Sequence, residues 1–195
     1  MYKRYGFFGS LKLLVSLIYT KLFFRQARLI RLPFDIRNRK HVKLGKNFTT
    51  GKGCRIEAHS DGDKKVIFIG KNVQINDYVH IAAMKNITIG DNVLIASKVF
   101  ISDLNHGRYG NEDLHDSPDI PPNNRKLYSK SVIIKDNVWL GEFVSVLPGV
   151  TIGKGTIVGA NSVVSKDLPD YSIAVGVPAK VIKKFNFNTQ KWEKV

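Results

Sequence analysis

The chain has 195 residues, 43% of them hydrophobic, which is enough for one domain with a sizeable core. Its single cysteine, Cys54, excludes an internal disulfide, so the composition is typical of a reducing compartment and we expect a cytoplasmic protein. The formal net charge of +15 is concentrated near the N-terminus, where residues 1–43 hold eleven Lys and Arg residues and one acidic residue, Asp35.

The first predicted element is a basic amphipathic helix, which with its linker occupies residues 1–41. Lys12, Ser16 and Thr20 share one helical face because they stand four residues apart, and Pro33 ends the helix. The apolar run nearly reaches the roughly 20 residues that span a bilayer, but Lys12 near its middle would cost roughly 3 kcal/mol there. No small-residue cleavage site follows, which argues against a cleaved signal peptide.

Three interpretations of this helix stay open. We favour peripheral association of residues 3–32 with the inner face of the cytoplasmic membrane, since anionic lipid attracts each basic residue by about 1 kcal/mol. The alternatives are packing against the chain itself or a sister subunit, and a spanning helix. We expect no nucleic-acid partner, because the basic residues alternate with a wide aliphatic face and no motif of a nucleic-acid module occurs.

A six-residue repeat follows. Every sixth residue from Ile134 is aliphatic, and the set is Ile134, Leu140, Val146, Ile152, Val158 and Val164. A period of six fits neither a helix nor a two-faced strand, and it predicts a coil with three flat sides that buries its inward side chains by stacking. Residues that tolerate a left-handed backbone recur at one place in the unit, which predicts a corner there. They are Asn47, Asn72, Asn92, Asn137 and Gly155.

The period breaks most widely between Ile101 and Ile134, where the chain is rich in Asn, Asp, Pro and His. A repeat that resumes after a long polar excursion has extruded a loop, here about residues 102–131. Loops on a rigid scaffold are where binding and chemistry concentrate. We therefore expect a coil over residues 42–184 carrying this loop, and a tail over residues 185–195 that caps the open end or reaches a neighbouring subunit.

The chain resembles the hexapeptide-repeat acyltransferases. The resemblance rests on the rows of the type Ile152-Gly153, on the phrase DNVWLGEFVSVLPGVTIGKGTIVGANSVVSKDLP and on YSIAVGVPAKVIKK near the end. It implies an all-β fold, a left-handed parallel β-helix, with a handedness that the spacing alone does not reveal. Within the family the chain is similar to galactoside and maltose O-acetyltransferases, and its helix and SDLNHG phrase are closer to enzymes that acetylate bacterial surface polysaccharides.

The resemblance implies a catalytic residue. His106 stands at the family's histidine position, and a histidine is the natural base near neutral pH for acyl transfer from a thioester to a hydroxyl. The backbone N–H of Gly141 matches the family's oxyanion donor, where a side chain would crowd the thioester. Asp103 and Asn105 are expected to orient the imidazole or touch the acceptor. Asn76 matches an acceptor-binding asparagine, or it simply forms a turn of the coil.

The resemblance also implies acetyl-CoA as donor. Residues at the family's cofactor positions are Trp139, Glu142, Ala160, Ser165, Lys180 and Lys183. Trp139 has packing as its alternative role, and the two lysines would act as point charges near the nucleotide phosphates. Glu142 replaces a small hydroxyl residue and both lysines replace arginine, so these contacts depart from the family pattern. Sites in this family lie between subunits of a trimer, which implies a homotrimer here.

The predicted function is acetyl-CoA-dependent O-acetylation of a sugar in a surface polysaccharide or its precursor, free or lipid-linked. N-acetylation of an amino sugar and a non-catalytic β-helix scaffold are the alternatives. A nucleotidyltransferase is disfavoured because no Gly-rich phosphate loop precedes the coil. No metal is expected, because His80, His106 and His115 lack the spacing of the three zinc ligands in related carbonic anhydrases.

Overall fold

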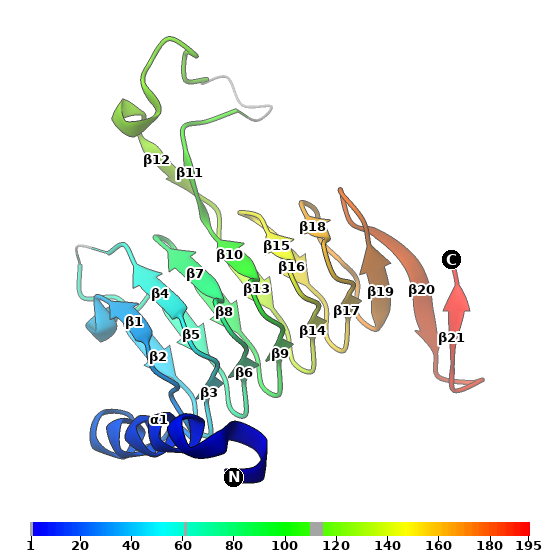
Figure 1. Ribbon diagram of the computed structural model, residues 1–195. Coiled ribbons are helices and arrows are strands. Elements are labelled where there is room, and N and C mark those ends of the chain that lie inside the picture. The colour runs from blue at the N-terminus through cyan, green and yellow to red at the C-terminus, as the bar shows by residue number, and fades with distance from the viewer. Residues whose placement is uncertain (1, 61, 110–114) are drawn as a thin grey trace.

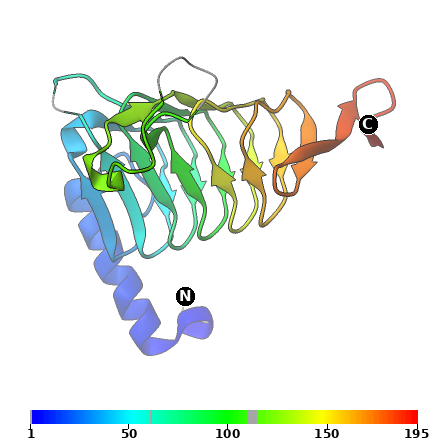
Figure 2. The ribbon, with the colours of Figure 1, turned by 90° about the horizontal axis from the view of Figure 1, so that it is seen from above.

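The computed structural model describes residues 2–60, 62–109 and 115–195. In this part of the chain, short parallel strands stack into a three-sided coil, with a helix at the first turns and a hairpin projecting from the middle (Figures 1 and 2). Each turn visits three sheets in the same order, which we name side C, side A and side B. The repeat therefore forms the predicted coil, and the sequence period of six is the length of one side.

The three sides are built from the following strands. Side A contains β3 (Thr49–Thr50), β6 (Gln74–Ile75), β9 (Leu94–Ile95), β14 (Trp139–Leu140), β17 (Ile157–Val158) and β19 (Ser172–Val175). Side B contains β1 (Phe34–Arg37), β4 (Cys54–Ala58), β7 (His80–Ala83), β10 (Phe100–Ser102), β15 (Ser145–Val146) and β18 (Val163–Val164). Side C contains β2 (Val42–Leu44), β5 (Ile67–Ile69), β8 (Ile87–Ile89), β13 (Val132–Ile134) and β16 (Thr151–Ile152).

The remaining elements lie outside the three sides or extend one of them. They are α1 (Tyr2–Phe23), the short helix η1 (Arg39–His41), the hairpin strands β11 (Leu104–His106) and β12 (Leu127–Ser129), the short helix η2 (Pro122–Asn124), and the final strands β20 (Lys180–Asn186) and β21 (Lys191–Lys194). The coil begins earlier than the expected boundary at residue 42, because β1 pairs in parallel with β4. Part of the predicted linker is therefore the first strand of side B.

The core is the axis of the coil. Each member of the row from Ile134 to Val164 is fully buried, and the small residues Thr156 and Ser162 of the second row are buried as well. The predicted corner is confirmed, since the repeated asparagines have a left-handed backbone with φ between 56° and 63°. The asparagine side chains form a ladder of hydrogen bonds along this corner. The Asn72 side chain accepts from that of Asn47 at 2.9 Å and donates to that of Asn92 at 3.0 Å.

A glycine follows the aliphatic residue in most turns, although Lys135 takes its place after Ile134, and the stacking of the turns explains the glycines. A Cβ on Gly45 would lie 2.1 Å from the backbone oxygen of Gly70, and a Cβ on Gly90 would lie 2.3 Å from a carboxylate oxygen of Asp136. Neither distance is possible for real atoms, so these positions exclude any larger residue. The same Asp136 oxygen accepts the backbone N–H of Asp91 at 2.8 Å and fastens one turn to the next.

The C-terminal tail does not fold over the open end of the coil. β20 pairs antiparallel with β19, and β21 pairs antiparallel with β20, so the tail extends side A beyond the last turn (Figure 1). Aromatic rings hold this hairpin together: Phe185 lies 5.2 Å from Trp192 and 5.0 Å from Phe187 between ring centroids. Phe187 also packs against Tyr171 of the last turn, with 4.9 Å between ring centroids. Contact of residues 185–195 with a neighbouring subunit stays a prediction.

Candidate active site

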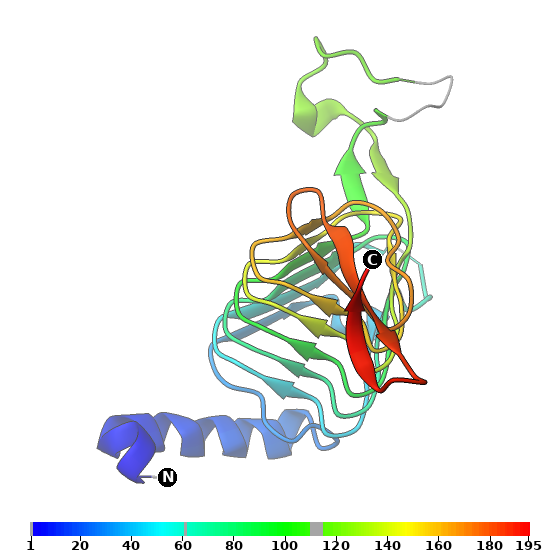
Figure 3. The same cartoon turned by 90° about the vertical axis from the view of Figure 1, so that its right-hand side faces the viewer.

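The predicted loop is a hairpin that stands clear of the coil (Figures 1 and 3). β11 and β12 pair antiparallel, with His106 opposite Leu127. The hairpin leaves after β10 of side B and returns to β13 of side C, so it emerges from the corner between these two sides. In a three-sided coil that corner lies opposite side A.

Asp103 anchors the base of the hairpin. Its side chain is fully buried, and its two oxygens accept the backbone N–H groups of Met84, Lys85 and Asn86 at 2.7–2.8 Å. Three donors satisfy a buried carboxylate well. Residues 84–86, which supply these donors, lie in the stretch that breaks the repeat between Ile81 and Ile89. This environment accounts for an aspartate here without a substrate, and contact of Asp103 with an acceptor stays a prediction.

His106 is exposed, and its ring orientation is set by a backbone group. Its Nδ1 lies 3.3 Å from the carbonyl oxygen of Pro122 in η2. A carbonyl can only accept, so we assign the ring proton to Nδ1, which leaves Nε2 as the basic nitrogen. In the described part of the chain no group hydrogen-bonds Nε2. The imidazole therefore presents a lone pair outward, as a general base must.

The backbone around His106 is braced by the outer part of the hairpin. The hydroxyl of Tyr109 donates to the carbonyl oxygen of His106, and Arg125 Nη1 donates to that hydroxyl at 2.6 Å. Arg125 also donates to the carbonyl oxygens of Ile120 and Pro118 at 2.8 and 3.1 Å. One guanidinium thus connects Tyr109 to the segment of residues 118–120. Asn105, on the same strand, is exposed and pairs with Tyr128.

Side A brings two predicted cofactor residues into one row. In register, Trp139 lies beside Ile157, Ile157 beside Ile173, and Ile173 beside Lys183. Trp139 is 48% exposed, so its ring stands on the surface rather than in the core. At the usual strand spacing the backbones of Trp139 and Lys183 are about 14 Å apart, and the pairing of β19 with β20 has a register shift next to Ile173. The row is an apolar track that ends in a cation, which suits a long apolar arm with an anionic end.

Asn76, Gly141 and Ala160 lie beside this row at the corner between sides A and B. Asn76 directly follows β6 and Gly141 directly follows β14, so both occupy the same position in their turns. Asn76 is partly buried and accepts from the Gln74 side chain at 3.0 Å, while Ala160 is exposed at the next turn. These three residues therefore lie on the same side of the coil as Trp139 and Lys183, but Asn76 and Lys183 are five strands apart, about 24 Å at the usual strand spacing.

Gly141 requires a correction. Its N–H donates to the carbonyl oxygen of Val158 at 2.8 Å, as part of the bonding between turns, so it is not free to receive an oxyanion. A structural reason for the glycine exists, because a Cβ would lie 2.6 Å from the backbone nitrogen of Ala160. The next residue, Glu142, is exposed, and among the described residues no acceptor is bonded to its N–H.

Other predicted residues lie elsewhere. Ser165 is exposed after β18, at the corner between sides B and C, and so is not grouped with Trp139. Lys180 is exposed at the start of β20, opposite Val175. Gly141 and Trp139 lie on side A, opposite the corner that carries His106. Within one chain the proposed base and the proposed cofactor face therefore point in different directions.

The other predicted loop and coil histidines have separate environments. His80 Nε2 lies 2.7 Å from a carboxylate oxygen of the nearly buried Glu57, which also accepts from Arg37 at 2.5 Å and lies 3.2 Å from Arg55 Nε. Burial lowers the pKa of His80, against the opposing hydrogen bond to Glu57. His115 is exposed and lines a hollow of about 310 Å³ on the hairpin.

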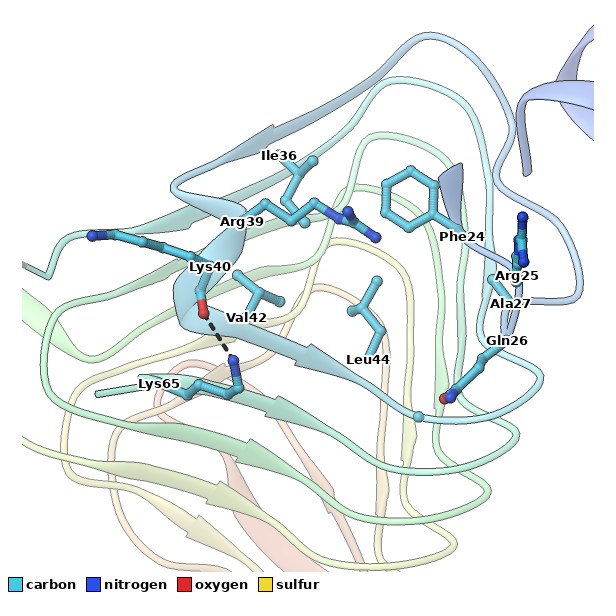
Figure 4. Close-up of a pocket in the computed structure, with 11 residues that line it drawn as sticks. Phe24, Arg25, Gln26, Ala27, Ile36, Arg39, Lys40, Val42, Leu44 and Lys65 are labelled. Carbon is cyan, nitrogen blue, oxygen red and sulfur yellow. Dashed lines mark hydrogen bonds between the residues drawn. The ribbon is translucent and has the colours of Figure 1, made fainter. Parts of the chain in front are cut away.

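A larger hollow lies at the open N-terminal end of the coil (Figure 4). Its volume is about 530 Å³, and it has an apolar lining of Phe24, Ile36, Val42 and Leu44. Cations surround it, namely Arg25, Arg39, Lys40 and Lys65. None of the predicted catalytic or cofactor residues lines it. Across residues 2–60, 62–109 and 115–195, no group of three or more His, Cys, Asp or Glu is placed to hold a metal ion.

Sequence reasoning missed the residues that hold His106. Pro122 acts through its backbone carbonyl, which every residue has, so no residue type marks the contact. Tyr109 and Arg125 were visible as an aromatic and a cation in a polar loop, but their spacing has no period. Gly107 gave a weaker signal: its φ is +105°, and a Cβ there would lie 2.4 Å from the Tyr109 hydroxyl.

Comparison with known proteins gives consistent relatives. Residues 131–166 match the family described as bacterial transferase hexapeptide (six repeats). The chain is 51% identical over 192 residues to "Putative lipopolysaccharide biosynthesis O-acetyl transferase WbbJ" of Escherichia coli (strain K12), covering 98% of this chain and 96% of that one. It is 40% identical over 120 residues to a galactoside O-acetyltransferase of the same strain, covering 62% of this chain and 55% of that protein.

Solved structures extend the likeness to the fold. A mutant of AntD, an N-acyltransferase from Bacillus cereus in complex with dTDP-4-amino-4,6-dideoxyglucose and coenzyme A, superposes with a TM-score of 0.70 at 26% identity, covering 88% of this chain and 90% of that one. A maltose O-acetyltransferase from Clostridium difficile 630 superposes with a TM-score of 0.58 at 28% identity, covering 89% and 88%.

Proposed function

The chain belongs to the bacterial hexapeptide-repeat acetyltransferases and is an acyltransferase, and we propose that it moves an acetyl group from acetyl-CoA to a sugar hydroxyl of a surface polysaccharide or its precursor. The observation that carries this proposal is His106, whose Nδ1 faces the carbonyl of Pro122 and whose Nε2 faces outward. The resemblance also supplies the left-handed sense of the coil.

The proposed reaction needs one proton transfer in each direction. Nε2 of His106 takes the proton from the sugar hydroxyl while the hydroxyl oxygen attacks the thioester carbonyl carbon. The tetrahedral intermediate then collapses, the carbon–sulfur bond breaks, and the imidazolium returns the proton to the departing thiolate. Hydrogen bonding of Nδ1 to the Pro122 carbonyl favours the tautomer that the reaction requires.

The donor is proposed to lie along side A. The row from Trp139 to Lys183 offers an apolar surface for the pantetheine arm and an ammonium for a phosphate. Ala160 and Lys180 lie beside that row. Ser165 lies at the corner between sides B and C, so it can contribute to this site only from another copy of the chain. Asn76, at the corner of the same face, remains the proposed acceptor contact.

The geometry supports a homotrimer with sites between subunits. His106 projects from the corner between sides B and C, whereas the proposed cofactor face is side A, so one chain does not bring the two together (Figure 3). A second copy placed with its side A against the hairpin does so. A closed ring of three copies repeats that contact without leaving an unpaired face.

The oxyanion donor must differ from the one expected. Because the Gly141 N–H is bonded to Val158, we assign the role to the following N–H, that of Glu142. A backbone donor at this corner lies next to Trp139 and keeps its place whatever the side chain is. A Glu142 side chain in place of a small hydroxyl residue therefore leaves the proposed donor intact.

N-acetylation is the second candidate, favoured by the superposition on AntD, an N-acyltransferase crystallised with a nucleotide-linked amino sugar. An amine must also lose a proton on acylation, so His106 serves both reactions. The product distinguishes them, because mild alkali releases an acetyl ester and leaves an acetamide. An alkali-stable product would select this second candidate.

The test is acetyl transfer from acetyl-CoA to surface saccharides, measured by mass spectrometry of the product. His106→Ala is expected to reduce the rate by about 10²–10⁴-fold without changing the melting temperature. His115→Ala is the matched control, because it removes another exposed histidine from the same hairpin. Undiminished transfer by His106→Ala would reject the mechanism, and no transfer by the wild type to any saccharide would favour the scaffold interpretation.

A further inference from the structure

The prediction of an amphipathic helix is wrong, because apolar residues occur on all sides of α1. Toward the coil, half-buried Leu17 and Tyr19 accompany two buried hydroxyl groups, and the outward side is mostly exposed apolar residues. Ser16 and Thr20 are 4% and 0% exposed, whereas Phe8, Ile18 and Leu22 are 77%, 53% and 65% exposed. Further exposed apolar residues on the helix are Phe7, Leu11, Leu14, Val15 and Phe23. This is the reverse of a helix on the surface of a water-soluble domain, which turns its apolar stripe toward the core.

The inward hydroxyls bind the helix to the coil. The hydroxyl oxygen of Thr20 accepts the backbone N–H of Ile30 at 2.8 Å, and that of Ser16 accepts the N–H of Leu32 at 3.2 Å. Just after the helix, Phe24 is buried within the first turns. The C-terminal half of the helix is therefore fixed to the first turns, and its N-terminal part projects beyond the side of the coil (Figures 2 and 3). The 19 residues 5–23 are long and apolar enough to cross a membrane, but crossing would break both hydroxyl contacts.

The charge around this face indicates what covers it. Lys21, Arg25 and Arg28 are exposed at the end of the helix. The basic hollow at the end of the coil follows directly, with Arg39 and Lys65 on its edge (Figure 4). No acidic residue occurs before Asp35. A second copy of a chain with a net charge of +15 would bring like charge to this surface, whereas an anionic bilayer brings the opposite charge.

We propose that the outward face of α1 inserts into the interfacial layer of an anionic membrane, with the helix axis parallel to the membrane plane. The apolar side chains enter the boundary between headgroups and acyl chains, and the flanking cations meet the lipid phosphates. The reducing compartment expected from the single cysteine makes this the inner face of the cytoplasmic membrane.

A consequence for the acceptor follows, and it rests on the proposed function. Tyr5 and Leu13 of α1 line a hollow of about 180 Å³ together with Asn76, the proposed acceptor residue. A helix on the membrane would therefore hold this hollow next to lipid, which favours a lipid-linked acceptor. The vesicle experiment below does not depend on catalysis, so it can fail or succeed independently of the proposed function.

The experiment is co-flotation of the full chain with vesicles that contain phosphatidylglycerol, compared with pure phosphatidylcholine vesicles. The variant Leu11→Gln/Ile18→Gln/Leu22→Gln keeps good helix formers at exposed positions, so it is expected to fold. Wild type is expected to float with the anionic vesicles. The variant is expected to bind them at least about 100-fold more weakly. Ile133→Gln/Ile182→Gln/Val195→Gln changes three exposed apolar residues elsewhere and is expected to bind as wild type.

Two further measurements test the two alternatives for this helix face, contact with a second copy of the chain and a helix that spans the bilayer. Sedimentation of wild type and variant is expected to give the same oligomeric mass, and alkaline carbonate is expected to release the wild type from vesicles. Equal binding by variant and wild type, or no binding by wild type, would overturn the proposal. A change of oligomeric mass without vesicle binding would identify the face as an interface between copies. Resistance to carbonate would identify a spanning helix, which also contradicts the proposal.

Discussion

The coil and the hairpin between β10 and β13 are held in place by different groups. In the coil, side chains such as Ile89 and Val146 are buried and repeat at a fixed interval, so each turn supports the next. In the hairpin, His106 is exposed and Arg125 is partly buried, and backbone carbonyls position both. The comparison teaches that changes in the coil should alter stability, whereas changes in the hairpin should alter activity.

The largest effect on stability is expected for Ile89→Ala, which empties a buried site on side C away from the hairpin. The lost burial and the cavity should lower the free energy of unfolding by about 2–5 kcal/mol, measured by urea denaturation. Ile133→Ala, an exposed position on the neighbouring strand, is the control and should change stability little. A large loss of turnover by the folded Ile89→Ala protein would break the comparison.

Asp103 joins the two regions, so its replacement should affect both. Asp103→Ala leaves the N–H groups of Met84, Lys85 and Asn86 without their acceptor, and we expect a loss of about 3 kcal/mol in unfolding free energy. Asp103→Asn keeps one oxygen and should lose less. If Asp103 instead contacts the acceptor, Asp103→Asn would raise KM for the saccharide while leaving the melting temperature unchanged.

Arg125→Gln should act on activity alone. It removes the ties from the guanidinium to Tyr109, Ile120 and Pro118, so the orientation of His106 becomes less defined. We expect kcat to fall about tenfold, with KM for acetyl-CoA unchanged. Lys126→Gln is the matched control for loss of a positive charge on the same hairpin. A fall in melting temperature comparable with that of Ile89→Ala would show that the hairpin is part of the cooperative core.

The smallest effect concerns the pH dependence of coil stability. Burial alone would raise the pKa of Glu57, but the hydrogen bond from His80 and the charges of Arg55 and Arg37 outweigh it and lower that pKa. A lowered folded-state pKa contributes stability that is present above the unfolded value of 4.5 and is lost as the pH falls through the folded-state pKa.

Melting curves of wild type and Glu57→Gln between neutral and acidic pH measure this contribution. The wild type should melt higher at neutral pH, and the difference should shrink below the unfolded pKa of Glu57. Burial lowers the pKa of His80, and the hydrogen bond and charge of Glu57 oppose that shift. Below 6.5, protonation of the unfolded chain should therefore destabilise both proteins, and Glu57→Gln more than the wild type, so the difference should widen in this higher window. A difference that does not shrink on further acidification below 4.5 would contradict the assignment.

Much of the coil could be predicted because its physics is periodic. Six aliphatic residues from Ile134 to Val164 share the axis, and Asn47 or Asn137 marks a corner that needs a left-handed backbone. The orientation of the helix could not be predicted in the same way. The stripe of Lys12, Ser16 and Thr20 was visible, but the backbone N–H groups of Ile30 and Leu32 turn only the two hydroxyl residues inward, and Lys12 stays exposed.

For the candidate site, the family resemblance marks His106, Trp139 and Lys183, and their roles stay predictions. Side A brings the last two into one row. Backbone groups escaped prediction: the Gly141 N–H is occupied by Val158, and the Pro122 carbonyl that orients His106 has no signature in the sequence.

The central claim is that the site joins the hairpin of one copy to side A of another. Mixing His106→Ala chains with Trp139→Ala/Lys183→Glu chains, each inactive alone, tests it after unfolding and joint reassembly. Random trimers should recover about a quarter of wild-type activity, because a seam works only when an intact hairpin meets an intact side A. A mixture that stays inactive, although sedimentation shows mixed trimers, would contradict the account.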